Sequence, residues 1–302
     1  MYNLSNLTIV IVTFLTSRKT LNDCLNSIDR SIKVIVIENS VKFSDRQFFL
    51  NKFKNLKIYC SGKNLGYGGG NNFGLEKVKT DFALILNPDT ILDKYFFKNL
   101  KLLLNNKSFS IIGCELLDDK NYMTGGFFDE NHNQEFKNDF FKIKRTNLTK
   151  VDWVTGSSML LNLKRIKTKK IFDENFFLYF EEFDFCQSLK KRDCLVYLCK
   201  SLKISHLGFK SSYSKKSNFK KEAVKLRNWH WMWSQFYYYK KNYGFINAFQ
   251  RSAGKLFKSL LKTLIYLLIF DHQNMNKYLY RSLGLISSIF GFKSSYRGKF
   301  FN

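Results

Sequence analysis

The first third of the chain alternates between short apolar runs that are typical of strands and segments with helical periodicity. Residues Leu7–Thr13 (LTIVIVT) form a continuous run, as expected of a strand buried on both faces of a parallel sheet. Further strands are predicted at 33–37, 56–60 and 82–86, and helices at 19–30, at about 45–53 and from near residue 70. This alternation predicts an α/β fold with a mostly parallel central sheet, whose ligands bind at the carboxyl ends of the strands.

The pattern is less regular beyond residue 118. Residues 118–150 are polar and predict a loop or hairpin excursion. Three further elements are expected: a strand at 153–162, a helix within 176–192 and a strand at 196–206. From about Phe219 the chain is predicted to be helical to its end. We therefore expect two parts, an α/β domain over 1–210 and a helical region over 211–302.

Basic residues outnumber acidic ones by two to one. The chain has 50 Lys and Arg against 24 Asp and Glu, which gives a formal net charge of +26. This balance favours a polyanionic partner, such as nucleic acid, anionic lipid or a phosphorylated substrate. The excess is concentrated in residues 211–302, which hold 17 Lys and Arg and only two acids, Glu222 and Asp271.

Aromatic and basic residues interleave in this C-terminal region. Trp229, Trp231 and Trp233 precede two lysines, and further lysines are spaced through and just before the apolar segment 256–270. This composition is typical of an interfacial membrane anchor; packing of the helices onto the rest of the protein is the alternative. No apolar stretch is long enough to span a bilayer, and the N-terminus lacks a signal-peptide pattern. We therefore expect a cytoplasmic protein that is peripheral on the inner face of the membrane.

A glycine-rich segment at 62–74 (GKNLGYGGGNNFG) is predicted to be a loop between a strand and a helix. Glycine allows a ligand to approach the backbone closely, and a helix N-terminus presents free N–H groups to an anion. The segment is not a Walker A motif, because no Gly-Lys-Ser/Thr follows, and it does not match a Rossmann fingerprint. A structural turn and a nucleotide-binding loop both remain open interpretations.

Two groups of polar residues stand where chemistry is expected. Asn87-Pro88-Asp89 follows the strand FALIL, and the only proline of the chain would hold a rigid turn that presents Asp89 to a divalent cation. The acids at 181–184 lie among aromatic residues, and carboxyl groups in apolar surroundings have raised pKa values that suit a general base. The alternatives are an ordinary turn and the solvated first turn of a helix. His206 is either structural or a further metal ligand.

Together these motifs resemble the family-2 glycosyltransferases with a GT-A fold, particularly the bacterial rhamnosyltransferase-like and galactofuranosyltransferase-like members. The similarity runs from about Leu7 to Gly208. Its pieces, in chain order, are IVIVT, VIVIENS, NLGYGGGNNFGL, LILNPDT, WVTGSSMLL, FFLYFEEFDFC and SHLGFKSS. The resemblance implies a GT-A catalytic domain over 1–210, followed by the helical extension.

The resemblance also implies a nucleotide-sugar site at the ends of the first strands. Thr13 and Glu38 would hold the nucleotide, although the family usually has Asp in place of Glu38. The other residues implied to line the nucleotide-sugar are Asn64, Gly66, Gly70, Asn71 and Asn87.

A divalent metal ion, Mg²⁺ or Mn²⁺, is implied beside this site. Asp89 matches the last acid of the family's metal-binding triplet, and His206 would supply a further ligand. Asn87 replaces the first acid of the triplet. Because hard cations prefer carboxylate oxygens, this replacement weakens the donor set.

The catalytic group is implied to be the acidic segment. Where the family has the pattern E-D-x-D, this chain has Glu181, Glu182 and Asp184, with Glu182 at the position of the general base. Trp153 and Gly156 would contact the acceptor.

The implied reaction is an inverting transfer of a sugar, with rhamnose as the first choice, to a hydroxyl of a glycan or lipid-linked acceptor in surface polysaccharide or lipopolysaccharide synthesis. The donor would be dTDP-rhamnose or a UDP-sugar. One alternative is a basic nucleic-acid-binding protein, which leaves the acidic segment unexplained, so no nucleic acid partner is expected. Another is a catalytically inactive sugar-nucleotide-binding relative, which would suit the replacements at Glu38, Asn87 and Glu182.

Overall fold

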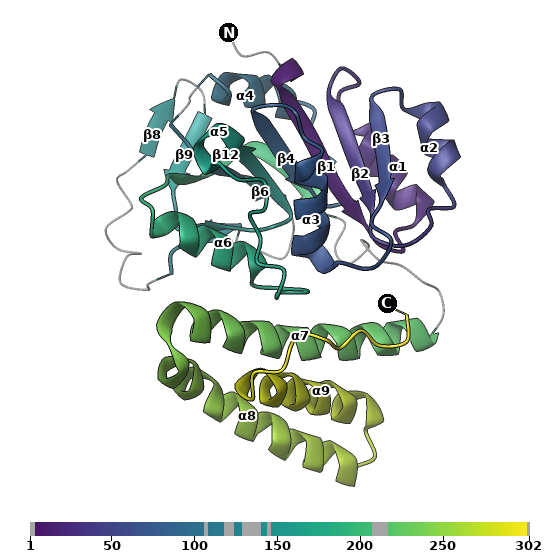
Figure 1. The fold of residues 1–302 in the computed structure, drawn as a ribbon, viewed down its shortest axis with the longest axis vertical. Helices are drawn as coiled ribbons and strands as arrows, with labels where there is room; N and C mark the ends of the chain where they lie inside the picture. Colours follow the sequence, from purple (N-terminus) through teal and green to yellow (C-terminus); the bar gives the residue numbers. More distant parts are fainter. Residues whose placement is uncertain are drawn as a thin grey trace. The chain divides into compact units, whose positions relative to one another are not determined.

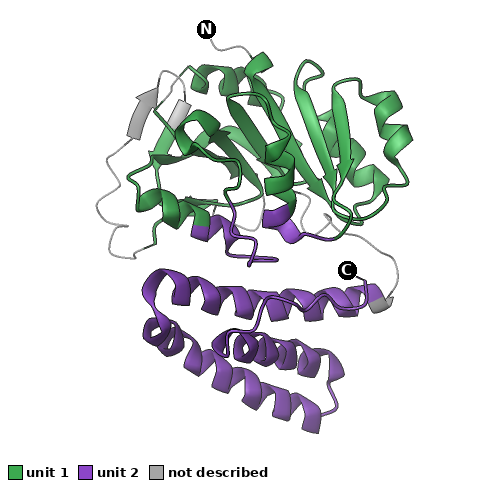
Figure 2. Cartoon of the chain, viewed as in Figure 1, with its two compact units in different colours: residues 1–63, 70–171, 185–213 green, residues 64–69, 172–184, 214–302 purple. Residues whose placement is uncertain are grey.

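The computed structural model describes residues 4–105, 108–117, 124–128, 140–143, 146–206 and 217–300, and these residues form two compact units. Figure 1 shows the fold and Figure 2 the two units. Unit 1 comprises the described residues within 1–63, 70–171 and 185–213, and unit 2 those within 64–69, 172–184 and 214–302. Residues 118–123, 129–139 and 144–145 of the predicted loop or hairpin excursion lie outside the described residues.

Unit 1 is built on one central sheet (Figure 1). Four strands pair in parallel in the order β3-β2-β1-β4: β1 (Leu7–Thr13), β2 (Lys33–Glu38), β3 (Leu56–Cys60) and β4 (Phe82–Leu86). The sheet continues in the order β11 (Ser158–Asn162), β6 (Ile111–Leu116), β12 (Val196–His206), β9 (Thr146–Lys150) and β8 (Phe140–Ile143), and β5 (Thr90–Leu92) pairs with β12. β11 runs antiparallel to both of its neighbours, whereas β6 and β12 are parallel.

Helices cover both faces of the parallel strands. The remaining elements of the first 210 residues are η1 (Leu4–Asn6), α1 (Arg18–Asn26), α2 (Arg46–Lys52), α3 (Gly66–Glu76), α4 (Phe96–Leu103), α5 (Leu163–Ile166) and α6 (Glu181–Lys190). Buried side chains of α1, α2 and α4 join Ile9 and Ile11 of β1 in one core. Because side chains alternate along a strand, Val10 and Val12 point to the other face, where α3 lies against them. The predicted α/β class is confirmed.

The helix predicted from near residue 70 is present as α3 but begins at Gly66, so the part of the glycine-rich segment predicted as a loop is helical from that residue onward. Glycine is a poor helix former, and its effect here is to let the helix backbone approach the sheet. A Cβ atom at Gly74 would lie 2.5 Å from Val10 Cγ1 and 3.1 Å from Ile37 Cγ1, and one at Gly70 would lie 2.7 Å from Val12 Cγ1. Close packing therefore accounts for these two glycines.

The segment 153–162, predicted as one strand, is divided into β10 (Trp153–Val154) and β11. β10 pairs with β7 (Gly125–Gly126) in a separate two-stranded sheet, while β11 enters the main sheet. The Val154 side chain lies directly over Gly113 of β6, where a Cβ atom would come within 2.6 Å of it. Since β10 thus lies over the face of the sheet, the chain must turn at 155–157 before β11 can pair.

Unit 2 contains the predicted C-terminal helices α7 (Ser217–Tyr243), α8 (Phe245–Leu268) and α9 (His272–Ile289), which pack on one another (Figure 1). Their common core holds Met232, Phe236, Ala248 and Leu285. Within the described ranges, no helix is both long enough and apolar enough to cross a membrane.

The last described segment folds back onto α7. His230 is fully buried and binds the carbonyl oxygen of Tyr296 through Nε2 at 2.7 Å, and its Nδ1 lies 3.0 Å from the Ser294 hydroxyl. Trp233 Nε1 donates to the carbonyl oxygen of Phe292 at 2.9 Å. Burial lowers the pKa of His230 to about 3, so this histidine is a neutral structural residue.

We predict that Gly74→Ala lowers the free energy of unfolding. Alanine gains about 1 kcal/mol from helix propensity, but overpacking against buried Val10 and Ile37 costs typically ~1–3 kcal/mol, and the 2.5 Å contact places this site at the upper end. Gly254→Ala in α8, where a Cβ atom would meet nothing within 4 Å, is the matched control and is expected to stabilise. Urea unfolding followed by circular dichroism measures both; equal shifts of the same sign would contradict the packing argument.

Candidate functional site

Thr13 and Glu38 meet at the carboxyl ends of β1 and β2 in unit 1. The parallel register pairs these two residues, and both are buried. The Thr13 hydroxyl donates to Glu38 Oε2 at 2.8 Å, and the Ser40 hydroxyl donates to Glu38 Oε1 at 2.8 Å. Burial raises the pKa of Glu38 above its ordinary value, while these two hydrogen bonds act in the opposite direction. The carboxyl group is therefore fixed in position at the edge of the sheet where ligands bind.

Asn39 belongs to the same cluster, although the sequence analysis did not select it. Its backbone N–H donates to the carbonyl oxygen of Thr13 at 2.7 Å, and its side-chain oxygen accepts from the Ser61 hydroxyl at 3.1 Å. A Cβ atom at Gly70 would lie 3.3 Å from Asn39 Nδ2, so the glycine leaves room for this buried amide. Its position directly after Glu38, at the end of a predicted strand, could have indicated that Asn39 belongs to the site.

The Asn87-Pro88-Asp89 turn follows β4 at the same edge of the sheet. The carbonyl oxygen of Asn87 accepts from the Thr90 hydroxyl at 2.6 Å, and its N–H donates to the carbonyl oxygen of Ser157 at 2.9 Å. Asp89 is fully buried. The strand residue His206 pairs with Thr90, the neighbour of Asp89, and so ends beside this turn.

A metal ion would have few protein ligands here. Among the described residues, no group of three or more His, Cys, Asp or Glu side chains is arranged to hold one. The oxygen donors that the sequence offers in this turn are the Asp89 carboxylate and the Asn87 amide. This set suits a cation that takes most of its ligands from water and from the phosphates of a substrate, as Mg²⁺ does.

Asn64 and Gly66 start helix α3 and belong to unit 2. The Asn64 side-chain oxygen accepts from the Gly66 N–H at 3.1 Å, which satisfies a free donor at the start of the helix. Gly66 has a φ of +76°, and a Cβ atom there would lie 2.2 Å from the carbonyl oxygen of Phe177. Only glycine fits this position. Asn71, the next predicted residue of α3, is buried in unit 1.

Glu181 and Glu182 form the first turn of α6, immediately after a strained turn of the backbone. Tyr179 and Phe180 have φ values of 69° and 68°, a left-handed conformation that is uncommon for bulky residues. Such conformations persist only where the surroundings enforce them, and they are concentrated at functional sites.

Contacts with helices α7 and α3 within unit 2 hold this turn in its strained conformation. The Ser234 hydroxyl donates to the carbonyl oxygen of Leu178 at 2.8 Å, and the Tyr67 N–H donates to that of Phe177 at 3.0 Å. The Trp231 ring contacts the rings of both left-handed residues, each at a centroid distance of 5.3 Å. The position of the two glutamates is therefore set by packing.

One oxygen atom of each glutamate carboxyl group is buried without a hydrogen bond to the described residues. Glu181 is buried and Glu182 is partly exposed, and the Oε2 atom of each is buried with no partner among the described residues. Burial raises the pKa of Glu181 well above its ordinary value, and the neighbouring charge of Glu182 raises it further. Burial also raises the pKa of Glu182 to about 7. A carboxyl group with this pKa can take up and release a proton near neutral pH.

Asp184 has a different environment from the two glutamates. It accepts from Lys241 Nζ at 2.7 Å and from Asn242 Nδ2 at 3.0 Å. Lys241 also donates to Asp173 at 2.7 Å. The structure thus places Asp184 in an ion pair with α7, where it anchors the start of α6.

The two predicted acceptor residues lie in unit 1. The Trp153 ring covers Gly126 of β7, where a Cβ atom would lie 3.1 Å from Trp153 Cζ2. Gly156 is buried in the turn between β10 and β11. The candidate site residues thus form two groups: Thr13, Glu38 and Asn39 lie in unit 1, and Glu181, Glu182 and Asp184 lie in unit 2.

Comparison with known proteins gives one family model and two curated relatives. The model for glycosyl transferase family 2 matches residues 8–166. The low-salt glycan biosynthesis hexosyltransferase Agl10 of Haloferax volcanii is 25% identical over 229 residues, which cover 70% of this chain and 72% of Agl10. The rhamnosyltransferase WbbL of Escherichia coli (strain K12) is 26% identical over 196 residues, which cover 57% of this chain and 71% of WbbL.

Solved structures show a similar fold at low identity. The structure of S. aureus TarS 1-349 matches with a TM-score of 0.51 and 12% identity over 98% of both chains. The mannosyltransferase PcManGT from Pyrobaculum calidifontis, in complex with GDP-Man and Mn²⁺, gives 0.53 and 10% over 94% of this chain and 86% of that chain. GalNAc-T7 with UDP, GalNAc and Mn²⁺ gives 0.55 and 12% over 79% of this chain, which spans half of the GalNAc-T7 chain.

We predict that Glu182→Gln makes the protein more stable at pH 8 than the wild type. A carboxyl group whose pKa is raised by folding favours the folded state below the ordinary pKa near 4.5 and loses that contribution as the pH rises through about 7. The wild type is expected to lose roughly 1–3 kcal/mol more than the variant between pH 5 and pH 8. Urea unfolding followed by tryptophan fluorescence tests this, because Trp229, Trp231 and Trp233 report on unit 2.

Glu76→Gln, an exposed side chain on α3, is the matched control and is expected to follow the wild type at both pH values. Parallel pH profiles of the wild type and Glu182→Gln would show that Glu182 has an ordinary pKa.

Proposed function

Since the chain belongs to glycosyl transferase family 2 and is a glycosyltransferase with a GT-A fold, we propose that it transfers a sugar, with rhamnose as our first choice, to a hydroxyl group of a glycan or lipid-linked acceptor. The donor would be dTDP-rhamnose or a UDP-sugar, and the product would contribute to a surface polysaccharide or lipopolysaccharide. The observation that carries the proposal is the pair of carboxyl groups, Glu181 and Glu182, held at the start of α6 with raised pKa values.

The nucleotide would bind at the strand-end cluster of unit 1. Glu38 already accepts hydrogen bonds from Thr13 and Ser40, and its carboxylate can accept further ones from a ribose hydroxyl or a base N–H. An acidic side chain after the second strand has this role in other nucleotide-binding α/β folds. The amide of Asn39 is held beside it and can both donate and accept.

Glu182 would act as the general base. The carboxylate takes the proton of the acceptor hydroxyl while the acceptor oxygen attacks the anomeric carbon from the face opposite the diphosphate. The bond between that carbon and the diphosphate oxygen breaks, and the nucleoside diphosphate leaves with the electron pair. The raised pKa strengthens Glu182 as a base at the pH where half of it is still ionised. Burial and the charge of ionised Glu182 raise the pKa of Glu181, so Glu181 would stay protonated when Glu182 is ionised.

Asp89 would hold a Mg²⁺ or Mn²⁺ ion together with the phosphates of the donor, and His206 would be a further ligand. Such an ion stabilises negative charge on the leaving diphosphate. Two of the structural neighbours were solved with Mn²⁺, which supports this assignment. One protein carboxylate is sufficient where phosphates and water complete the coordination shell.

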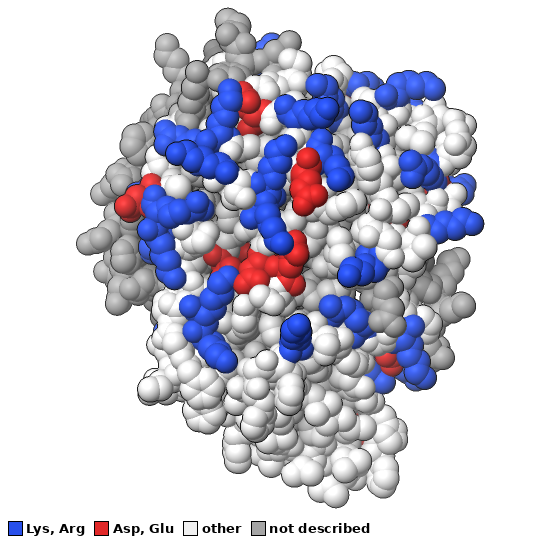
Figure 3. Space-filling model, viewed as in Figure 1, with Lys and Arg blue, Asp and Glu red and all other residues white. Residues whose placement is uncertain are grey.

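We also propose that unit 2 contacts an anionic membrane at the inner face of the cytoplasmic membrane. One side of α8 exposes a row of large apolar side chains: Phe257, Leu260, Leu261, Leu264, Leu267 and Leu268. On the face shown in Figure 3, the part of unit 2 below α7, where Figure 1 draws α8 and α9, shows almost no charged side chains. An exposed apolar patch of this kind marks an interaction surface, and basic residues of the same region would attract acidic lipid. Membrane contact would bring a lipid-linked acceptor to the enzyme.

We predict that Glu182→Gln lowers kcat about 10²–10⁴-fold, the usual contribution of a general base. Asp89→Asn is expected to lower kcat/KM by about 100-fold. The measurement is release of nucleoside diphosphate from a panel of dTDP-, UDP- and GDP-sugars with Mg²⁺ or Mn²⁺ and a glycan or lipid acceptor. In the wild type, kcat/KM is expected to rise with pH through about 7 as Glu182 loses its proton.

Glu76→Gln is again the charge-matched control and should retain wild-type turnover. Undiminished release by Glu182→Gln would remove Glu182 from the role of base. Donor binding without any turnover, in the wild type as in the variants, would instead identify an inactive sugar-nucleotide-binding relative.

We predict that Leu264→Ser with Leu268→Ser lowers co-sedimentation with anionic vesicles at least tenfold. Each leucine contributes roughly 1.5–3 kcal/mol when fully buried, so partial insertion of two is sufficient for this effect. Val41→Ser, which removes a 77% exposed apolar side chain from unit 1, is the control. Equal sedimentation of the two variants would show that the row on α8 is not the membrane contact.

A further inference from the structure

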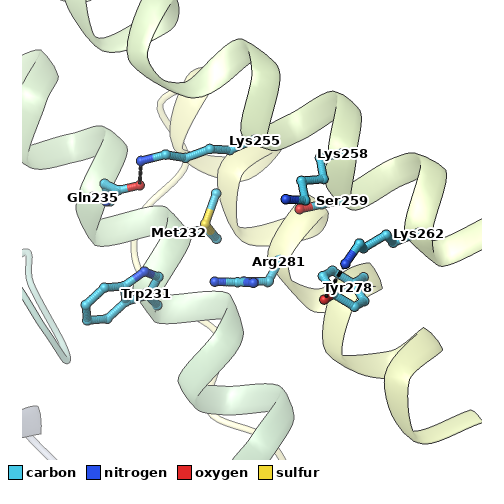
Figure 4. Close-up of a pocket in the computed structure, with 9 residues that line it drawn as sticks. All are labelled: Trp231, Met232, Gln235, Lys255, Lys258, Ser259, Lys262, Tyr278 and Arg281. Carbon is cyan, nitrogen blue, oxygen red and sulfur yellow. Dashed lines mark hydrogen bonds between the residues drawn. The ribbon is translucent and has the colours of Figure 1, made fainter.

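A cavity of about 280 Å³ lies among α7, α8 and α9, within unit 2 and apart from every residue assigned above to catalysis (Figure 4). Its basic side chains are Lys255, Lys258 and Lys262 of α8 and Arg281 of α9. The rings of Trp231 on α7 and Tyr278 on α9 form part of its wall. The volume is that of about nine water molecules at ~30 Å³ each, which is enough for a small polar group.

The basic side chains of the cavity have no acidic partners. No salt bridge to any of the four is formed within the described part of the chain, and no acid is among the residues that line the cavity. The two acids of the helical region are used elsewhere, since Glu222 binds Lys225 at 2.8 Å and Asp271 caps the start of α9 through the Asn274 N–H at 3.0 Å. Four positive charges are therefore gathered without compensation.

Neutral groups hold two of the lysines toward the cavity, as the dashed lines in Figure 4 show. Lys255 Nζ donates to Gln235 Oε1 at 2.7 Å, and Lys262 Nζ donates to the Tyr278 hydroxyl at 3.1 Å. Arg281 extends between Trp231 and Tyr278, and its buried Nε has no hydrogen-bond partner among the described residues. A buried guanidinium N–H without an acceptor destabilises the fold, and a bound anion would supply that acceptor.

Burial and neighbouring positive charge both disfavour the charged form of Lys255. Burial lowers the pKa of Lys255, and the positive charges of Arg251 and Arg281 lower it further. An anion in the cavity would reverse this effect and relieve the repulsion. Both the geometry and the charge of the cavity are therefore those of an anion site.

We propose that this cavity binds the terminal phosphate of an anionic lipid headgroup, through Lys258, Lys262 and Arg281. A phosphate monoester carries up to two negative charges and accepts several hydrogen bonds, which matches a cluster of four cations with fixed donors. This proposal deepens the membrane contact proposed above and rests on it, but it does not depend on the transfer reaction.

The lipid source follows from the two sides of α8. Lys255, Lys258 and Lys262 recur at helical spacing and face the cavity, whereas Phe257, Leu261, Leu264 and Leu268 recur on the other side and are exposed. An α-helix with its side chains is about 10–12 Å wide, so a headgroup bound in the cavity would lie within about one helix diameter of a bilayer surface that this apolar row enters. A soluble phosphate compound would leave the row without a partner.

The test compares two variants that remove the same charge from the full-length chain. Lys258→Gln with Arg281→Gln empties the cavity of two cations, and Lys220→Gln with Lys221→Gln removes two exposed lysines of α7 outside it. Co-sedimentation is measured with phosphatidylcholine vesicles that contain phosphatidic acid, or phosphatidylglycerol at matched surface charge. The wild type and the α7 variant are expected to bind the phosphatidic acid vesicles about tenfold more tightly than the matched ones, and the cavity variant to show no preference.

A thermal unfolding measurement shows that the cavity variant is folded and separates the possible sources of phosphate. Because removal of like charges relieves repulsion, the cavity variant is expected to unfold at the wild-type temperature or above it. Inorganic phosphate at constant ionic strength is expected to raise the unfolding temperature of the wild type and the α7 variant only. Equal stabilisation of all three proteins by phosphate would overturn the site.

Stabilisation confined to the intact cavity, without a preference for phosphatidic acid, would overturn the lipid assignment in favour of a soluble phosphate compound. The vesicle assay contains no sugar donor, so its result is independent of whether nucleoside diphosphate is released.

Discussion

The strained turn at Tyr179 and Phe180, together with the two glutamates that follow it, is the constraint around which unit 2 is organised. Two adjacent carboxyl groups with buried, unpartnered oxygens destabilise the fold, and two left-handed aromatic residues add to that cost. The Trp231 ring and the Ser234 hydroxyl of α7 hold the turn, so the aromatic side of this helix offsets the cost. A carboxyl group with a raised pKa is the chemical property obtained.

The buried carboxyl group of Glu38 in unit 1 has a different environment from those of the two glutamates in unit 2. Glu38 is buried as well, but Thr13 and Ser40 donate to its two oxygens, so the carboxylate is oriented with much smaller cost. As an acceptor it can bind only groups that carry a hydrogen, such as a sugar hydroxyl, and it disfavours phosphate. Glu38 and the glutamates of α6 therefore differ in their properties because of the hydrogen bonds around them: both oxygens of Glu38 accept one, whereas one oxygen of Glu181 and one of Glu182 accept none from the described residues.

The sequence predicted those features that depend on neighbouring residues in the chain, and it missed those that depend on contacts between distant residues. The strands at Leu7–Thr13 and 82–86 were predicted correctly because their apolar runs are decided by burial alone. The helix predicted from near residue 70 begins four residues earlier, at Gly66, because glycine gives little local signal for a helix, whereas close packing of Gly70 and Gly74 on the strands favours it. The sequence did not predict the role of Asn39 in the strand-end cluster or the cavity around Arg281, because the residues that surround each come together only in the folded chain. The roles of the selected site residues remain proposals.

Lys241 of α7 contacts both ends of the segment that carries the glutamates, since it donates to Asp173 and to Asp184 at 2.7 Å. One ammonium group thereby closes the intervening residues into a ring, and it removes the entropy that an open loop of that length would have. The closure is made by two ion pairs rather than by a disulfide. It therefore shares the properties of an ionic clasp: it weakens as salt screens the pair, and it can open and re-form without breaking a covalent bond.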